Sequence, residues 1–181
     1  MKTFIIAAVS ADGFIAKDAT HAAFWTSKED KARFVKLTRE AGVVIMGSTT
    51  YATLPRPLKE RRNIVYTKSK TFENPETETT QEKPQDLIER LKKELGPDGK
   101  PIQSIAICGG SQIYSMFLKA RVVDKIYLTI EPIIFGKGIS LFNEELSIHL
   151  KLVAAQGTPS GSLLLEYDVD YNGTNSVQAT K

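Results

Sequence analysis

Apolar residues follow two patterns along the chain: short continuous runs and stripes with helical spacing. Short apolar runs bounded by turn residues are typical of strands that are covered on both faces of a sheet. The chain is predicted to form strands at 4–9, 43–46, 63–67, 105–108 and 125–130, and two more at 151–156 and 163–171. Because only a short glycine-containing segment, 157–161, separates the last two strands, we expect them to be antiparallel.

Helix signals lie between these runs. Thr26 or Ser27 can cap a helix that continues to about Ala41, and Gly42 ends it. The other predicted helices are a short one that begins near 47 and stops before Pro55, an amphipathic one at 84–95 with apolar residues at 87, 88, 91 and 95 on one face, and one that follows Gly110 and ends near 120. The stretches 10–25 and 68–83 are predicted to be loops, the second with room for one short strand.

This alternation of strands and helices predicts an α/β fold, with a mostly parallel sheet and helices on both of its faces. A chain of 181 residues fits one domain of this kind. We expect the domain to cover residues 1–171 and the polar tail at 172–181 to be disordered.

Composition and charge narrow the function classes. Hydrophobic residues make up 41% and charged residues 25%, as in ordinary globular domains. The formal net charge of +3, without a long basic stripe, argues against nucleic acid as a partner. No apolar run approaches the roughly 18 residues of a membrane span, and no export signal is recognisable, so no membrane partner is expected. A single cysteine, Cys108, excludes an internal disulfide and favours a reducing, cytoplasmic compartment.

Two strand-to-helix turns share one design. The strand at 43–46 continues into Gly47, Ser48 and two threonines, and the strand at 105–108 continues into Gly109 and Gly110. Glycine lets a backbone approach a ligand closely, and the N–H groups at a helix start favour phosphate. The alternative is that these glycines only allow tight packing of strand on helix. Because both turns occur in one chain, the pattern favours a dinucleotide with its pyrophosphate at these turns.

Asp30 is the candidate for proton chemistry. It falls on one helical face with Phe34, Leu37 and Ala41, so its carboxyl would be partly buried. Burial raises the pKa of a carboxyl, which suits a group that holds a proton near neutral pH. The alternative is a capping box with Ser27, in which Asp30 only stabilises the helix start, and spacing alone favours that alternative.

The remaining candidates are less specific. The basic stretch at 56–62 is a solvated turn or the source of an arginine that binds a substrate carboxylate. Trp25 fills the core or shields a pocket. His21 and His149 have no ligand spacing around them, so no metal site is predicted. Cys108 is expected to be a small buried apolar residue and not a nucleophile.

Five segments, taken in order, resemble the dihydrofolate reductase family. They are 7–15 with its Ala-Ala pair and Asp-Gly turn, 44–51 with its Gly-x-x-Thr turn, 56–65 with Arg-Pro-Leu, 107–114 with Gly-Gly followed by Tyr114, and 124–129, which ends in Leu-Thr. The resemblance extends from residue 1 to about residue 142. It implies a single-domain dihydrofolate-reductase-like fold: a central, mostly parallel mixed sheet of about eight strands, an antiparallel C-terminal hairpin and about four flanking helices.

The resemblance also implies roles for individual residues. In the family a tryptophan precedes the catalytic acid by five positions and a phenylalanine follows it by four, which here gives Trp25, Asp30 and Phe34. Asp30 would then bind the amidine edge of a pterin and favour protonation of its imine nitrogen, with Thr129 supporting Asp30. The implied substrate-binding residues are Ile6, Ala7, Phe34, Leu54, Leu58 and Arg61, the last for a glutamate carboxylate. The implied cofactor-binding residues are Ala8, Ile15, Gly47, Ser48, Thr49, Thr50, Thr67, Lys68, Cys108, Gly109, Gly110, Ser111, Gln112, Ile113 and Tyr114.

The implied activity is NADPH-dependent reduction of dihydrofolate or a closely related pterin by a monomer or homodimer. Ser48 and Gln112 stand where family members often carry arginines for the 2′-phosphate of NADPH, and Lys68 or Lys70 could supply that charge instead. Two alternatives stay open. One is a reductase of the riboflavin-biosynthesis type that acts on 5-amino-6-(5-phosphoribosylamino)uracil, because 25–30 and 131–138 resemble that branch equally well. The other is a nucleotide-binding regulatory module without activity.

Overall fold

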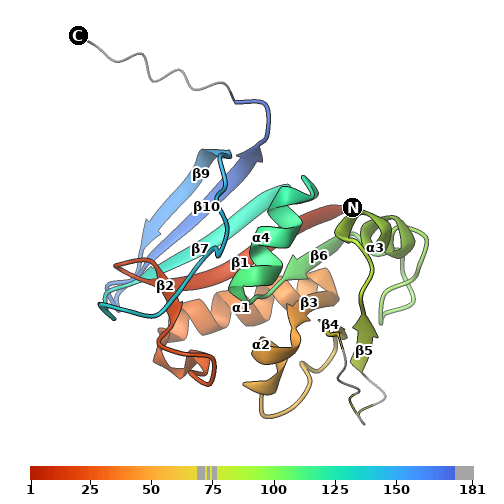
Figure 1. Ribbon diagram of the computed structural model, residues 1–181, viewed down its shortest axis with the longest axis horizontal. Coiled ribbons are helices and arrows are strands. Elements are labelled where there is room, and N and C mark those ends of the chain that lie inside the picture. The colour runs from red at the N-terminus through yellow and green to blue at the C-terminus, as the bar shows by residue number, and fades with distance from the viewer. Residues whose placement is uncertain (69–71, 73, 75–76, 174–181) are drawn as a thin grey trace.

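An eight-stranded sheet forms the centre of the protein in the computed structural model, which describes residues 1–68, 72, 74 and 77–173 (Figure 1). The strands are β1 Lys2–Ser10, β2 Phe14–Ala16, β3 Val43–Gly47, β4 Arg62–Tyr66, β5 Thr77–Thr80, β6 Ser104–Ile107, β7 Lys125–Glu131, β8 Ile139–Ser140, β9 His149–Gly157 and β10 Leu163–Asp170. The α-helices are α1 Lys28–Ala41, α2 Ser48–Ala52, α3 Pro84–Leu91 and α4 Ser111–Lys119. Most of the tail that we expect to be disordered, 174–181, lies outside the described residues, as does Lys70.

The strand order is β5-β4-β3-β6-β1-β7-β10-β9. Six strands from β5 to β7 pair in parallel, and β10 is antiparallel to both β7 and β9. Parallel strands need crossover connections, and helices supply those from β1 to β3, from β3 to β4, from β5 to β6 and from β6 to β7. The expected α/β class, the mostly parallel sheet of about eight strands and the C-terminal hairpin are therefore confirmed.

Two apolar layers hold the helices against the sheet. On one face α1 packs through Phe34 and Leu37 against Phe4, Val44 and Met46. On the other face α3 and α4 pack against Ile5, Ile45 and Ile64 through Leu87, Ile88, Leu91, Ile113, Phe117 and Leu118. Because adjacent side chains of a strand point to opposite faces, the continuous apolar runs supply both layers. These layers fix the positions of the strand ends, and therefore also the positions of the turns that follow them.

The helix predicted at 84–95 ends earlier, at Leu91. Leu95 is 60% exposed and pairs with Pro101 in an isolated β-bridge, so its place in the apolar stripe was wrong. The N–H of Glu94 donates to the carbonyl of Leu91, a bond that tightens the last turn. Pro97 follows. A proline in a helix interior has no N–H to donate and its ring clashes with the preceding turn, so the helix does not continue through this segment.

The stretch 10–25, predicted as a loop, contains β2 and a 3-10 turn at Ala23–Trp25. β2 pairs with β8 in a separate two-stranded sheet. The close approach of the two strands requires Gly138, because a Cβ atom there would overlap the carbonyl oxygen of Ala16. This small sheet holds the segment before α1 across the carboxyl ends of the main strands.

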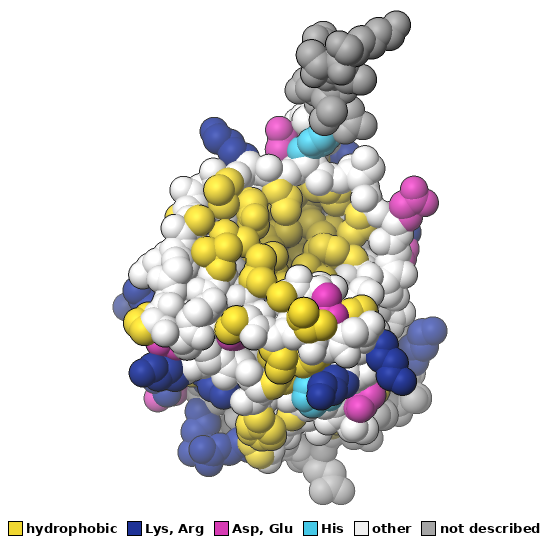
Figure 2. Space-filling view, turned by 90° about the vertical axis from the view of Figure 1, so that its left-hand side faces the viewer, with side chains coloured by type: hydrophobic (Ala, Val, Ile, Leu, Met, Phe, Trp, Pro, Cys, Tyr) yellow, Lys and Arg dark blue, Asp and Glu magenta, His cyan; other side chains and the backbone are white. Residues whose placement is uncertain are grey.

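The edge strand β9 carries exposed apolar side chains, among them Leu150, Leu152 and Val153. Leu163 of β10 is also exposed. The side of the molecule on which β9 and β10 lie has a broad hollow lined with hydrophobic groups (Figure 2). The outer end of the sheet is thus more apolar than an ordinary solvent-facing edge strand.

Candidate active site

A cavity of about 1010 Å³ lies where β1, β3 and β6 meet the starts of α1, α2 and α4. Its size matches that of pockets for cofactors and other small molecules. Every residue that the family resemblance assigns to the cofactor lines it, and so do Asp30, Trp25, Phe34, Ile6 and Ala7. The segments that the sequence analysis placed together are therefore brought to one cavity.

The two glycine turns lie against each other. The N–H of Gly47 donates to the carbonyl of Gly109 at 2.8 Å. A Cβ atom on Gly47 would lie 3.1 Å from Ile113 Cγ1, and one on Gly110 would lie 3.0 Å from Thr50 Oγ1. Gly109 has φ +117°, and a Cβ atom there would lie 3.0 Å from the Tyr114 hydroxyl. These glycines therefore serve tight packing, as the alternative interpretation holds, and the turns that they allow also line the cavity.

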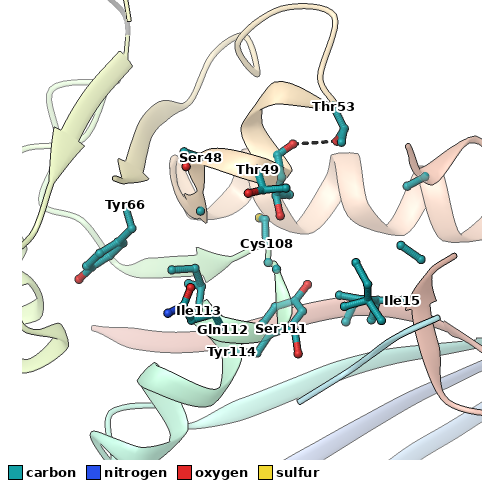
Figure 3. Close-up of a pocket in the computed structure, with 18 of the residues that line it drawn as sticks. Ile15, Ser48, Thr49, Thr53, Tyr66, Cys108, Ser111, Gln112, Ile113 and Tyr114 are labelled. Atoms are coloured by element: carbon teal, nitrogen blue, oxygen red, sulfur yellow. Dashed lines mark hydrogen bonds between the residues drawn. The ribbon is translucent and has the colours of Figure 1, made fainter. Parts of the chain in front are cut away.

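Polar groups at the cavity wall lack partners. Within the described residues, the buried side-chain atoms without a hydrogen-bond partner are Trp25 Nε1, the Tyr66 hydroxyl and Ser111 Oγ, and all three residues line this cavity. Ser111 begins α4, whose N-cap residue Gly110 has no side chain to cap the first N–H groups, and uncapped N–H groups at a helix start favour an anion. Residues of the α4 start lie opposite Ser48 and Thr49 of α2, with Tyr66 at one end and Ile15 at the other (Figure 3). Unpartnered buried polar atoms are costly, so this wall fits a polar ligand such as a dinucleotide.

Asp30 lies in the first turn of α1 and is 9% exposed. Burial raises the pKa of its carboxyl above the ordinary value of 3.8, hydrogen bonds from the Thr129 and Thr26 hydroxyls oppose that rise, and the negative charge of Glu131 adds to it. A carboxyl in this setting retains its proton at higher pH than an exposed one. Thr129 is itself buried and does not line the cavity, so its contact is with Asp30.

The Ser27 cap differs from the capping-box alternative. Ser27 Oγ accepts the N–H of Asp30 at 3.2 Å, as a helix cap does. The backbone N–H of Ser27 donates at 2.9 Å to Glu131 Oε1 and not to Asp30. The Asp30 carboxyl therefore makes no return bond to the helix start, and it belongs to the cavity wall.

Aromatic side chains close the cavity beside Asp30. The Trp25 ring meets Phe135 edge-on, with centroids 4.9 Å apart, and His21 stacks on Trp25 at 6.3 Å. Lys31 Nζ donates to the carbonyls of Phe24 at 3.1 Å and Thr26 at 2.8 Å, which fixes the segment that carries Trp25. The result is an apolar wall around one buried carboxyl, an environment that strengthens electrostatic contacts with a ligand.

Arg61, Leu54 and Leu58, which the resemblance assigns to the substrate, do not line the cavity. Arg61 Nη1 donates to Thr38 Oγ1 at 2.7 Å and its Nε donates to the Lys59 carbonyl at 2.9 Å. Leu54 and Leu58 pack against the apolar layer on the α1 face of the sheet. In this structure the arginine stabilises the segment before β4 and does not face the cavity.

Sequence reasoning missed several cavity residues. They include Asp18, His21, Lys31, Thr53, Tyr66, Met116, Ile139 and the segment 80–84. Tyr66 ends β4 beside the turns of the parallel neighbours β3 and β6, so its place could be inferred once the strand order is known. His21 carries no such signal, because it reaches the cavity only through the path of the segment between β2 and α1.

The described residues do not favour a cysteine nucleophile or a metal site. Burial raises the pKa of the Cys108 thiol to about 12, so it is protonated at neutral pH and not a nucleophile. Across residues 1–68, 72, 74 and 77–173, no three of the His, Cys, Asp and Glu side chains group closely enough to hold a metal ion. In the same residues no helix has the length and apolar character needed to cross a bilayer.

Comparison with known families decides the relationship. A family model described as dihydrofolate reductase matches residues 2–137. The chain belongs to the dihydrofolate reductase family. The match contains both glycine turns, Asp30 and Thr129, so these features of the site lie within the part of the chain that defines this family.

Individual proteins resemble this chain in sequence or in fold. YwjB of Bacillus subtilis is 28% identical over 152 residues, which cover 79% of this chain and 83% of that protein. A structure of a protein assigned to riboflavin biosynthesis from Shewanella sp. PV-4 superimposes with a TM-score of 0.72, 22% identity and coverage of 94% of this chain and 99% of the other.

A Thermotoga maritima deaminase and 5-amino-6-(5-phosphoribosylamino)uracil reductase gives a TM-score of 0.69 and 18% identity. The match covers 93% of this chain and 56% of that longer one. At these identities the structures establish a shared fold.

Proposed function

We propose that this protein reduces a conjugated C=N bond of a dihydropterin ring with NADPH, and dihydrofolate is the first substrate to test. The observation that carries the proposal is the buried Asp30 carboxyl in the wall of a cavity that two glycine turns also line. A single acid group with a raised pKa, apolar walls and an anion-binding helix start are the parts that such a reduction needs.

The residues at the two turns fit the cofactor. Ser111 Oγ, the free N–H groups at the start of α4 and the Tyr66 hydroxyl would bind its polar groups. Bound NADPH supplies the hydride. The protein contributes the rest: Gly47, Gly109 and Gly110 leave room for the backbone turns, and Trp25 and Phe34 exclude water from the space beside Asp30.

The Asp30 carboxyl would accept hydrogen bonds from the N–H groups of the heterocycle. It would also favour protonation of the imine nitrogen of the C=N bond that is reduced. The hydroxyls of Thr26 and Thr129 orient its carboxyl. Because the carboxyl is buried, its hydrogen bonds to a ligand are not in competition with water. Its raised pKa keeps a larger protonated fraction at a given pH than an exposed aspartate would have.

The test is a substrate panel with purified protein and either NADPH or NADH. Dihydrofolate, a dihydropterin without the glutamate tail and 5-amino-6-(5-phosphoribosylamino)uracil are each followed by the loss of reduced-nicotinamide absorbance. Turnover of a dihydropterin supports the proposal. Binding of the cofactor by calorimetry without turnover of any substrate would contradict it and favour a regulatory nucleotide-binding module.

Turnover is expected to depend on pH through Asp30. The pKa of Asp30 is raised, so its protonated form persists to higher pH than that of an exposed aspartate and is lost as pH rises through the raised value. We therefore expect kcat/KM to be constant on the acid side and to fall by about tenfold per pH unit above that pKa. A profile measured with dihydropterin and saturating NADPH checks this; no falling limb attributable to a single group would contradict it.

A second candidate is reduction of a ribosylaminopyrimidine phosphate. The position of Arg61 favours it, because a folate-tail arginine would be expected at the cavity, whereas the cations that line the cavity include Lys68 and Lys83. The panel separates the two candidates by which heterocycle is turned over.

Arg61→Ala is expected to change the KM for dihydrofolate by less than about threefold, since the Arg61 guanidinium bonds Thr38 and Lys59 and recognition rests on the ring. Steady-state kinetics of the variant check this, with the tail-free dihydropterin as the control substrate. A rise of tenfold or more in the KM for dihydrofolate, without a rise in the KM for the tail-free dihydropterin, would mean that Arg61 binds the glutamate carboxylate.

A further inference from the structure

Glu131 is a second buried carboxylate close to Asp30, and contact with a ligand in the cavity does not account for its burial. It ends β7, is 3% exposed and does not line the cavity. Oε1 accepts hydrogen bonds from the N–H and the hydroxyl of Ser27, at 2.9 and 2.8 Å, and Oε2 accepts one from the Ser162 hydroxyl at 2.6 Å. These donors are neutral, so Glu131 is held by directed hydrogen bonds.

The hydrogen bond from the Ser27 N–H to Glu131 replaces one bond of a capping box, in which the N–H of the cap residue donates to an acidic side chain three positions later. In a capping box the cap hydroxyl binds the N–H of the third helical residue, and that residue's carboxylate binds the N–H of the cap. Here the first half is present, from Asp30 N–H to Ser27 Oγ. The second half is made by Glu131, which lies 104 positions further along the chain.

We propose that Glu131 is a positioning residue for Asp30: by accepting the Ser27 N–H, it leaves the Asp30 carboxyl to face the cavity. The inference rests on the proposed function, because Asp30 needs that orientation only if it serves a ligand. Without an acceptor from β7, the partly buried Ser27 N–H would be unpaired, and the carboxylate on α1 placed to accept from it in a capping box would be that of Asp30.

Glu131 also acts on Asp30 through its charge. The charged groups that act on Asp30 are Glu131 on β7 and Arg33 on α1, and the Asp30 charge in turn acts on Tyr114 of α4. Lys31 of α1, and Asp18 and His21 of the segment before α1, line the same cavity. The Arg33 guanidinium donates to the carbonyls of Leu128 at 3.3 Å and Leu165 at 2.8 Å, and its charge lowers the pKa of Asp30. The charge of Glu131 raises that pKa, so the two fixed charges oppose each other across one carboxyl.

Two substitutions separate the charge from the hydrogen bond. Glu131→Gln keeps an oxygen that accepts the Ser27 N–H and removes the charge. Glu131→Ala removes both. The matched control is Glu29→Gln, which removes a carboxylate from the same helical turn; Glu29 Oε2 accepts a hydrogen bond from Ser160 at 2.9 Å on the surface.

The measurement is a ¹³C NMR titration of side-chain carboxyls in the full chain, with Asp30 assigned from Asp30→Asn, together with the pH profile of turnover. We expect Glu131→Gln to lower the Asp30 pKa and move the falling limb of the profile to lower pH, with kcat at low pH unchanged. Glu131→Ala should lower kcat itself by about tenfold, the effect of one lost charge-assisted hydrogen bond. Glu29→Gln should change neither.

The outcomes also separate this inference from the proposed function. If the wild type reduces no substrate and Glu131→Gln still lowers the Asp30 pKa, the proposed function fails and the link between Glu131 and Asp30 stands. If turnover is normal and Glu131→Ala folds with the kcat and the Asp30 titration of the wild type, the inference is overturned. Glu131→Gln preserves the hydrogen-bond acceptor and therefore tests only the charge of Glu131. If Glu131→Ala does not fold, Glu131→Leu, which fills more of the same space without an acceptor, takes its place in the second comparison.

Discussion

Asp30→Asn is expected to lower turnover by about two to four orders of magnitude, the usual contribution of one acid–base group. Asparagine keeps the size of the side chain and an oxygen for the Thr26 and Thr129 hydroxyls, but it cannot hold or release the proton. Steady-state oxidation of NADPH with the best dihydropterin of the panel measures the loss. Glu29→Gln is the control, since it changes the same charge one residue earlier.

The same substitution should raise the stability of the protein at neutral pH. The pKa of Asp30 is raised in the folded state, so its protonated form favours folding and that contribution is lost as pH rises through the folded pKa. Asparagine removes the cost of a buried ionised carboxyl above that pH. The melting temperature of Asp30→Asn should therefore exceed that of the wild type at pH 8 and approach it at pH 4. Lower stability at pH 8 combined with normal turnover would contradict the assignment of Asp30.

Gly109→Ala is expected to abolish measurable NADPH binding at micromolar protein and to lower the free energy of unfolding by about 1–3 kcal/mol. Gly109 has φ +117°, where side chains are strained, and a Cβ atom would lie 3.0 Å from the Tyr114 hydroxyl. That hydroxyl donates to the Ile6 carbonyl at 2.9 Å, so displacing it disturbs β1 beside the cavity. Fluorescence titration with NADPH and thermal unfolding measure the two effects.

Gly99→Ala is the matched control for this variant. Gly99 also has a positive φ, +73°, but nothing lies within 4 Å of a Cβ atom there, and it is remote from the cavity. We expect it to cost about 1 kcal/mol of stability and to leave NADPH affinity unchanged. Equal affinity in Gly109→Ala and the wild type would mean that this turn does not contact the cofactor.

The sequence was most informative where local signals and tertiary environment agree. The buried strands β1, β3 and β6 are continuous apolar runs, and the glycine turns that follow β3 and β6 therefore could be placed at one edge of the sheet. By contrast β2 and β8 are three and two residues long, too short to show a period. Their pairing depends on the fit of Gly138 against Ala16, which no local pattern reports.

Within the site, the sequence was ambiguous where a role depends on a distant partner. Asp30 is ambiguous in sequence because Ser27 and Asp30 alone fit a capping box. The competing acceptor, Glu131, belongs to a strand more than a hundred residues away. Arg61 shows the same problem, because its bond to Thr38 of α1 appears only when β4 is placed beside β3.

The last two strands line no part of the cavity, yet they are bonded to the helix that carries Asp30. The Leu165 carbonyl accepts from Arg33 of α1, and Ser162 donates to Glu131. A chimera that joined residues 1–148 to the terminal hairpin of a relative would therefore keep every residue that lines the cavity. It would lose the hydrogen bonds that the hairpin makes to Arg33 and Glu131, the two charged residues beside Asp30, unless the new hairpin supplied them. For such grafts to work, the donor hairpin must bring a hydroxyl at position 162 and a carbonyl at position 165 that Arg33 can reach; a hairpin without them has to be exchanged together with α1.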